Sequence, residues 1–288
     1  MKNKDCKKNL KEKKLNITPL EGVKNGKYFE LKNEIVSKIC MPYDTRENIN
    51  KVDEIDNLAL YINKYSFLDV KKFKFVYCDE YKINKVLINE IAQNYYKKIE
   101  KLKKLNLIEE SFELETDERL IIGLGGACVY ETSLTLHHIY GVPYIPGSAI
   151  KGSFRSYLIE KRFNNNEKDA MDEGWFKKIF GNEENQGKVI FFDAFAVSDL
   201  NILPDIMNPH YQDYYSDDKN KVYPTDDQSP VPIPFLVVKG KFKFVFGVKE
   251  DFKVENKEVL KFVKEELQNS LKEFGIGAKT AVGYGYFK

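Results

Sequence analysis

A glycine-rich segment near the C-terminus, residues 274–287, restricts the backbone more than any other stretch of this sequence. Its four glycines stand at near-alternate positions, and glycine is costly wherever an ordinary backbone would serve. The segment must therefore turn unusually or be approached closely by another group. Lys279 and Thr280 lie in its middle, so the approaching group is expected to be anionic. The glycines are Gly275, Gly277, Gly283 and Gly285.

Two glycine clusters resemble nucleotide-binding motifs, and each lacks a required part. A P-loop has Gly-Lys before Ser or Thr and a helix that begins there, whereas Ala278 precedes Lys279 in this chain. The residues after Thr280 indicate a short aromatic strand at 281–288 rather than a helix. In the cluster Gly123–Cys128, a cysteine occupies the third glycine position of a dinucleotide fingerprint, and no helix follows. The sequence predicts no cofactor.

Composition limits the class of protein. At 288 residues, with 42% hydrophobic and 31% charged residues, the chain can bury a full core, as one domain with elaborations or as two. It has no apolar run long enough to span a membrane and no apolar signal region at its start, which predicts a cytoplasmic protein without membrane contact. Its four cysteines include no CxxC pair, and the sequence predicts no metal site. The net charge of +2 is too small to indicate a nucleic-acid binder.

The pattern of apolar residues divides the chain into three parts. Residues 1–20 are expected to form a flexible lysine-rich tail, residues 21–110 to be mostly helical, and residues 111–288 to combine strands and helices. The clearest helix of the middle part, 83–105, has a lysine-rich face that is typical of a solvated surface. This face carries Lys97, Lys98, Lys101, Lys103 and Lys104.

The order of elements in residues 111–288 predicts the fold class. A β-α-β unit, a polar insertion at about 199–232 and a second β-α-β unit indicate an α+β protein. This order is the split βαβ of a ferredoxin-like, RNA-recognition-type fold, here with a helical N-terminal extension. Gly275 is expected to close the last helix in a left-handed conformation. The expected strands are 111–124, 188–198, 235–248 and a terminal strand, and the expected helices are 148–162 and 256–274.

The helix expected at 148–162 begins with residues that disfavour a helix start. Ser148 is a good N-cap, but Lys151 lies near the positive end of the helix dipole, with Arg155 one turn further along the same face. Gly152 inside the helix costs roughly 1 kcal/mol relative to alanine. A phosphate bound by free amides and Lys151, with Gly152 allowing close approach, would explain all three. The alternative is that both cations are exposed, at a cost of roughly tenths of a kcal/mol.

Four sequence blocks resemble the RAMP superfamily of CRISPR effector proteins. Pro146–Arg155 and Gly275–Gly285 are similar to the superfamily as a whole. Glu131–His137 and Asp205–Tyr211 are similar more narrowly to the sixth-subunit family of type III-B (Cmr) effector complexes. The resemblance covers about residues 119–288, and no motif stands out in residues 1–110.

The resemblance implies a backbone subunit that binds RNA and does not cut it. Its partners would be the CRISPR guide RNA, near its 3′ end, the target RNA and other Cmr effector subunits, in antiviral defence. In the polar insertion, Asn208, His210 and Tyr211 would face RNA or hold the base of the loop, and the acidic stretch 213–227 would face a protein partner. Carried over by position, the other RNA-contacting residues are Gly147, Ser148, Lys151, Gly152 and Arg155 in the first motif and Gly275, Gly277, Lys279, Thr280, Gly283 and Gly285 in the glycine-rich loop.

Two other functions remain compatible with the residues. In a metal-independent CRISPR-RNA endoribonuclease, His137 or His210 would act as the base beside the 2′-hydroxyl. His137 and His138 would point to opposite faces of a continuing strand, and a lone histidine beside Tyr140 is more often structural. The aspartates between residues 193 and 205 are spaced too loosely for metal-dependent cleavage, so the chain is not expected to be an enzyme. In the other alternative the chain is a protein scaffold, and its glycines serve only packing.

Overall fold

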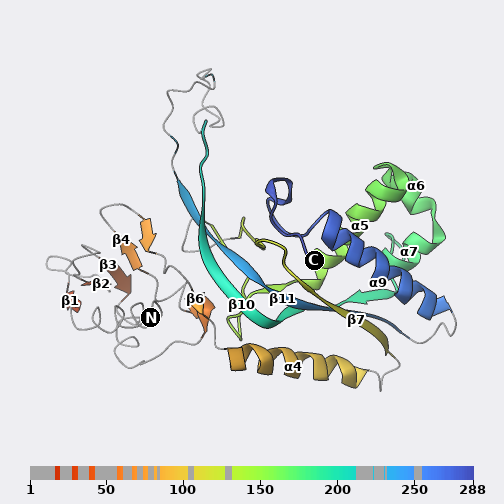
Figure 1. Cartoon of the computed structure of the whole chain (residues 1–288), viewed down its shortest axis with the longest axis horizontal. Coiled ribbons are helices and arrows are strands. Elements are labelled where there is room, and N and C mark those ends of the chain that lie inside the picture. Colours follow the sequence, from red (N-terminus) through yellow and green to blue (C-terminus); the bar gives the residue numbers. More distant parts are fainter. Residues whose placement is uncertain are drawn as a thin grey trace.

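An antiparallel sheet lies at the centre of the computed structural model (Figure 1), so an α+β protein is confirmed. The structure describes residues 57–60, 85–102, 107–126, 132–211, 232–249 and 255–288, the backbone of six short strands before residue 83, and positions 223 and 230. The main sheet has the order β6 (Tyr81–Lys82), β10 (Ala194–Met207), β11 (Ile233–Lys249) and β7 (Leu107–Glu115). In addition, β8 (Tyr144–Ile145) pairs with β10, and β9 (Val189–Phe191) pairs with β11.

Helices cover both faces of this sheet (Figure 1). On one face α5 and α9 pack over β7 and β11, and on the other face α4 packs against β10. Two short helices, α6 and α7, extend the layer of α5. The helices are α4 (Lys85–Lys101), α5 (Gly147–Phe163), α6 (Glu167–Asp172), α7 (Gly174–Phe180) and α9 (Glu255–Glu273).

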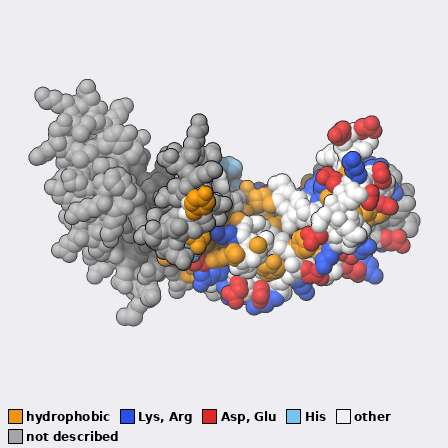
Figure 2. All heavy atoms as spheres, turned by 90° about the horizontal axis from the view of Figure 1, so that it is seen from above, with side chains coloured by type: hydrophobic (Ala, Val, Ile, Leu, Met, Phe, Trp, Pro, Cys, Tyr) orange, Lys and Arg blue, Asp and Glu red, His pale blue; other side chains and the backbone are white. Residues whose placement is uncertain are grey.

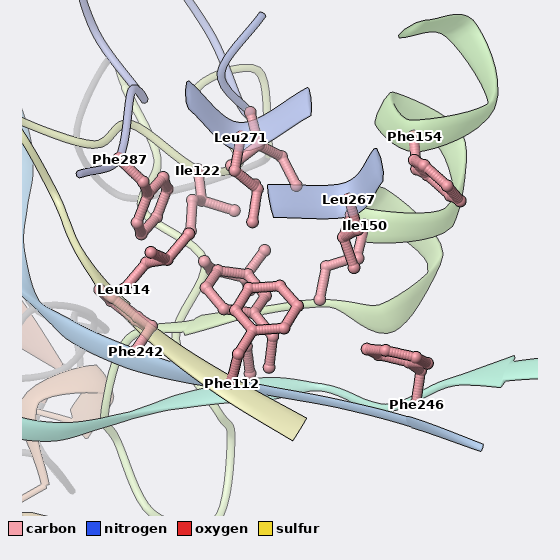
Figure 3. Close-up of a cluster of buried hydrophobic side chains, with 14 of the residues drawn as sticks. Phe112, Leu114, Ile122, Ile150, Phe154, Phe242, Phe246, Leu267, Leu271 and Phe287 are labelled. Carbon is pink, nitrogen blue, oxygen red and sulfur yellow. The ribbon is translucent and has the colours of Figure 1, made fainter. Parts of the chain in front are cut away.

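The main core lies between the sheet and the layer of α5 and α9. Phe112 and Phe242 of the sheet lie opposite Ile150 of α5 and Leu267 of α9 (Figure 3). Phe287, near the C-terminus, closes this cluster on the side of β7. Full burial of such a side chain contributes roughly 1.5–3 kcal/mol, so the apolar stripes of the two helices hold them on the sheet.

On the opposite face, a tyrosine anchors α4 to two strands. The Tyr96 hydroxyl donates a hydrogen bond to the Lys243 carbonyl at 2.7 Å and accepts one from the Phe195 amide at 3.0 Å. Burial raises the pKa of Tyr96 well above its ordinary value, so the hydroxyl keeps the proton that it donates. Because α4 and β6 both contact β10, the structural unit begins before residue 111.

The predicted helices at 83–105, 148–162 and 256–274 are confirmed as α4, α5 and α9. The strand expected at 188–198 is interrupted at Asp193, which separates β9 from β10. The terminal strand expected at 281–288 is wrong. There the chain forms a 3-10 helix, η2 (Thr280–Val282), and then pairs with the end of β7 through an isolated bridge between Thr116 and Phe287.

The N-terminal part and the insertion also differ from expectation. The described segments of region 21–110 include strands as well as α4, whereas a mostly helical region was expected. β10 continues to Met207, so the insertion begins later than residue 199. The acidic stretch 213–227 lies outside the described residues, as does the tail before β1. Within the described chain, no helix is long and apolar enough to cross a membrane. The early strands are β1 (Ile17–Pro19), β2 (Tyr28–Leu31), β3 (Ile39–Pro42), β4 (Phe67–Asp69) and β5 (Lys74–Val76).

Candidate nucleic-acid interface

Helix α5 begins one residue earlier than expected and is capped by a distant side chain. Pro146 occupies the N-cap position, so the expectation that Ser148 caps the helix is wrong; Ser148 is exposed in the first turn. The Gly147 amide donates instead to Asp193 Oδ1 at 2.7 Å. A Cβ on Gly147 would lie 2.3 Å from the Phe191 carbonyl oxygen, so packing requires this glycine. The Asp193 carboxylate therefore accepts the hydrogen bond of one of the free backbone amides that were expected to bind a phosphate.

The three unusual residues of α5 differ in their surroundings. Lys151 is half-buried and has no carboxylate partner in the part of the chain that the structure describes. Gly152 is exposed, and a Cβ there would meet nothing within 4 Å. Arg155 forms a 2.6 Å ion pair with Glu167 of α6, and its guanidinium lies 5.5 Å from the centroid of the Phe176 ring. Lys151 and Gly152 thus offer charge and room to a ligand, whereas Arg155 already has partners within the protein.

The glycine-rich loop is held against the segment that follows β7. The amides of Ala278 and Gly285 donate to the carbonyls of Ile121 and Arg119, at 2.9 and 2.8 Å respectively. Gly277 and Gly285 have positive φ, and a Cβ at either would lie 2.1 Å from a carbonyl oxygen. The fold itself therefore requires these two glycines, which is what the protein-scaffold alternative predicts for all of them.

The outer turn of the loop faces open space. Gly283 is exposed, and a Cβ there would meet nothing within 4 Å. Lys279 adopts φ 60, a left-handed conformation that costs a lysine roughly 1–2 kcal/mol. Its Nζ lies 6.0 Å from the centroid of the Phe235 ring, and no carboxylate among the described residues pairs with it. Thr280 is half-buried, and its carbonyl accepts a hydrogen bond from the Gly283 amide at 3.0 Å. Strain at an unpaired lysine points to a role outside folding.

The two predicted motifs lie side by side, although the two residues that join them are 122 positions apart in the sequence. The Ser153 hydroxyl of α5 donates a hydrogen bond to the Gly275 carbonyl at 3.0 Å. One turn later, the Tyr157 ring meets the Phe274 ring edge-on at 5.3 Å. Gly275 has φ 70 and its amide donates to the carbonyl of Ser270, which confirms it as the left-handed cap of α9. The structure therefore brings α5 and the glycine-rich loop together.

An ion pair that sequence reasoning missed fixes the loop to β10. Arg119 Nη1 lies 2.5 Å from Asp205 Oδ2, which also accepts a hydrogen bond from the Tyr284 hydroxyl at 2.9 Å. Burial alone would raise the pKa of Asp205, but hydrogen bonds from the Ile206 amide, Arg119 and Tyr284 outweigh it and hold the pKa below its ordinary value. The partners lie 86 and 79 positions from Asp205, so no local pattern could indicate the cluster.

His137 is held in an aromatic stack. Its Nδ1 accepts a hydrogen bond from the Tyr140 amide at 3.3 Å, and the two rings stack at 4.6 Å. The rings of His137 and His138 also stack, at 5.3 Å, so the expectation that they point to opposite faces is wrong. The physical reason is that the chain turns at residues 138–140 instead of continuing as a strand. Burial lowers the pKa of His137, and the neighbouring His138 lowers it further.

The three residues predicted in the insertion lie just beyond the end of β10. Asn208 and His210 are exposed, and Tyr211 is half-buried with its ring 6.4 Å from that of His210. No hydrogen bond or ring contact within the described residues joins them to α5 or to the glycine-rich loop. The described part of the chain also has no group of three or more His, Cys, Asp or Glu that could hold a metal ion.

Charges of both signs are mixed over the end of the molecule that carries the helices α5 to α9 (Figure 2). Arg162 of α5 pairs with Glu266 of α9 at 2.6 Å, and Lys161 pairs with Glu273 at 2.7 Å. Together with the pair of Arg155 and Glu167, these pairs leave Lys151 as the cation of α5 that has no carboxylate partner among the described residues.

Comparison with known proteins identifies the family. A model of the RAMP superfamily matches residues 113–288, which is more than half of the chain. The chain belongs to the RAMP superfamily. The matched region contains α5, the glycine-rich loop and the strands that position them, so the candidate interface lies within the RAMP part of the chain.

Relatives of this RAMP chain confirm its resemblance to the sixth-subunit family. It is 33% identical over 251 residues to the CRISPR system Cmr subunit Cmr6 of Pyrococcus furiosus, covering 68% of this chain and 72% of the relative. It is 31% identical over 208 residues to Cmr6 of Saccharolobus solfataricus, covering 70% of this chain and 66% of the relative. Among solved structures it is similar to a chain of the type III-B Cmr-beta complex bound to cognate target RNA, solved by cryo-EM. That match has a TM-score of 0.54 and 28% identity, and covers 69% of this chain and 65% of the other.

Proposed function

We propose that this RAMP chain is a non-catalytic, RNA-binding backbone subunit of a type III-B CRISPR ribonucleoprotein. It would hold the guide RNA near its 3′ end, support binding of the target RNA in antiviral defence, and contact other Cmr subunits. The two curated relatives are Cmr6 subunits, and the similar solved complex is bound to target RNA. One observation carries the proposal: α5 meets the glycine-rich loop, and each contributes a glycine that faces open space and a lysine that has no carboxylate partner among the described residues.

The sugar-phosphate backbone of RNA fits this arrangement. Lys151 and Lys279 supply point charges that can each meet a phosphate, and Gly152 and Gly283 present no side chain that would keep the backbone away. Contacts of this kind position an RNA strand without reading its bases. Binding at this site is therefore expected to depend weakly on RNA sequence and strongly on salt.

The proposal includes a ferredoxin-like, RNA-recognition-type fold. The C-terminal residues lie beside β7 through the bridge between Thr116 and Phe287, β7 pairs with β11, and β11 pairs with β10. All of these pairings are antiparallel. They support a split βαβ sheet whose fourth strand is reduced to the bridge.

We propose no cleavage by this chain, because His137 is held in a stack and its Nδ1 lone pair already accepts a hydrogen bond from the Tyr140 amide. His210 is exposed and is the base that the endoribonuclease alternative would need. Incubation of the chain with CRISPR repeat RNA, without divalent metal ions, distinguishes the two functions. Intact RNA is expected. Discrete products that disappear in the His210→Ala variant would establish the endoribonuclease instead.

The salt dependence of RNA binding tests the site. Lys151→Ala and Lys279→Ala should each weaken binding of single-stranded RNA to a similar degree for all sequences, because each removes one phosphate contact. Each should also reduce the slope of log K against log salt by about 0.7–1, and the double variant by about twice as much. Lys257→Ala, on the exposed side of α9, is the matched control and should change neither quantity. A double variant with wild-type affinity and slope would show that this site does not bind RNA.

A further inference from the structure

A hollow on the face of the sheet away from α5 plays no part in the site proposed above. It is open, has a volume of about 510 Å³, and lies between the last turns of α4 and the turn that carries Tyr140. In Figure 1, α4 lies below the sheet, on the side opposite α5 and α9. We call this depression the α4 hollow; its lining residues are Asn94, Lys97, Lys98, Glu100, Lys101 and Tyr140.

Helical spacing places three lysines on one side of this hollow. Asn94, Lys97, Lys98 and Lys101 follow one another at i, i+3, i+4 and i+7, so they share one face of α4, and all four are exposed. None of the lysines has a carboxylate partner among the residues that the structure describes. Three lysines against the one glutamate of the lining leave the hollow with a net charge of +2. The α4 hollow therefore attracts anions.

Tyr140 gives the hollow a fixed aromatic wall. Its ring stacks on His137 at 4.6 Å, and His137 in turn stacks on the exposed ring of His138 at 5.3 Å. A residue from a distant segment also holds the turn that carries these rings: Asn57 Nδ2 donates a hydrogen bond to the Ile139 carbonyl at 2.9 Å. A planar ligand could use this wall with little ordering of side chains on binding.

We propose that the α4 hollow binds a segment of single-stranded RNA, with phosphates on Lys97, Lys98 and Lys101 and a base against Tyr140. Unpaired cations beside aromatic rings are the combination that single-stranded nucleic-acid sites use. An acidic protein segment would match the lysines but would leave the aromatic wall without a partner. The volume lies within the range of about 300–1,000 Å³ that is typical of small-ligand sites, so it can accommodate a nucleotide. The inference shares with the proposed function only its ligand class, since its residues are separate from α5 and the glycine-rich loop.

A triple substitution in the full chain tests the hollow. Replacing Lys97, Lys98 and Lys101 together with alanine keeps a strong helix former at each position, so α4 is retained. We expect the triple variant to bind single-stranded RNA at least tenfold more weakly, with a salt slope smaller by about two. The matched control replaces Lys257, Lys261 and Lys272 of α9 with alanine. These lysines are also exposed, so the control removes the same charge from another helix. If the two triple variants bind single-stranded RNA with equal affinity and equal salt slope, the proposal is overturned.

The same triple substitution in the Lys151→Ala/Lys279→Ala background separates the two sites. Further loss of the residual binding is expected, because the contacts are independent. If the triple variant alone loses affinity while the double variant does not, the α4 hollow stands and the site on α5 and the loop fails. The reverse result overturns the α4 hollow and leaves the other site in place.

Cross-linking provides a measurement that needs no substitution at Tyr140, whose ring also packs on His137. RNA that carries 4-thiouridine is cross-linked to the wild-type chain, and the attached peptides are identified by mass spectrometry. Cross-links at Tyr140 or within residues 94–101 are expected. Cross-links confined to α5 and the glycine-rich loop would overturn the proposal. So would a triple variant that binds RNA normally but fails to assemble with other Cmr subunits, since this would make the hollow a protein-binding surface.

Discussion

Gly152→Ala should strengthen helix α5 while filling the space beside Lys151. In the free protein the added methyl group meets nothing within 4 Å, so no clash opposes the better helix propensity of alanine. Alanine is favoured over glycine in a helix interior by about 1 kcal/mol. We therefore expect the free energy of unfolding to rise by about 1 kcal/mol and the thermal midpoint to rise by about 2 °C for a chain of this size.

RNA binding by this variant should change in the opposite direction. If a phosphate approaches α5 at Gly152, the methyl group overpacks the contact, which costs roughly 1–3 kcal/mol. This corresponds to a rise in Kd of roughly 5- to 140-fold, since about 1.4 kcal/mol is tenfold. Urea denaturation measures the stability, and fluorescence anisotropy with labelled single-stranded RNA measures the affinity. Gly174→Ala, at the first residue of α7, is the control for affinity, because a Cβ there also meets nothing within 4 Å. A Gly152→Ala variant that gains stability and keeps full affinity would refute the reasoning.

Three further predictions concern packing and charge. Gly277→Ala should destabilise the chain by roughly 2 kcal/mol or more, whereas Gly283→Ala, with only backbone strain, should cost about 1 kcal/mol; urea midpoints measure both. Asp205→Asn should cost about 1 kcal/mol or less at neutral pH, because solvent screens the pair. The folded pKa of Asp205 is lowered, so this contribution is present above the unfolded pKa of about 3.9 and is lost as pH falls through the folded pKa. The unfolding free energies of wild type and variant should therefore converge in acid, and a constant difference would count against the pairing. Arg155→Ala should cost a few tenths of a kcal/mol and leave the salt slope of RNA binding unchanged, because Glu167 already pairs with the guanidinium; a smaller slope would show that Arg155 meets RNA.

Local features of the structure could be predicted from the sequence, and long-range ones could not. The stripes of α5 and α9 and the left-handed Gly275 depend on residues within a few positions of one another. The cap of α5 comes from Asp193, which lies 46 positions from Gly147. This contact explains two errors together: the helix begins without using Ser148, and the strand expected at 188–198 is interrupted where Asp193 turns towards the helix.

The glycine-rich loop shows the same limit at single residues. Its sequence indicates that the glycines permit an unusual backbone, and positive φ at Gly277, Gly283 and Gly285 agrees with this. Which glycine serves the fold depends on distant neighbours: Gly277 contacts the carbonyl of Ile121, and a Cβ on Gly283 would meet nothing within 4 Å. Residue type alone does not separate these two cases, because it carries no information about the distant neighbours of each glycine.

The central claim is that the loop holds Lys279 for an RNA phosphate at the expense of backbone strain, and Lys279→Gly tests it most directly. Glycine adopts φ 60 without strain, so the folded loop is retained and the stability should stay within about 1 kcal/mol of wild type. The affinity of this variant for single-stranded RNA, measured over a series of salt concentrations, should fall about tenfold, with a slope smaller by about 0.7–1. A stable variant with wild-type affinity and slope would contradict the claim.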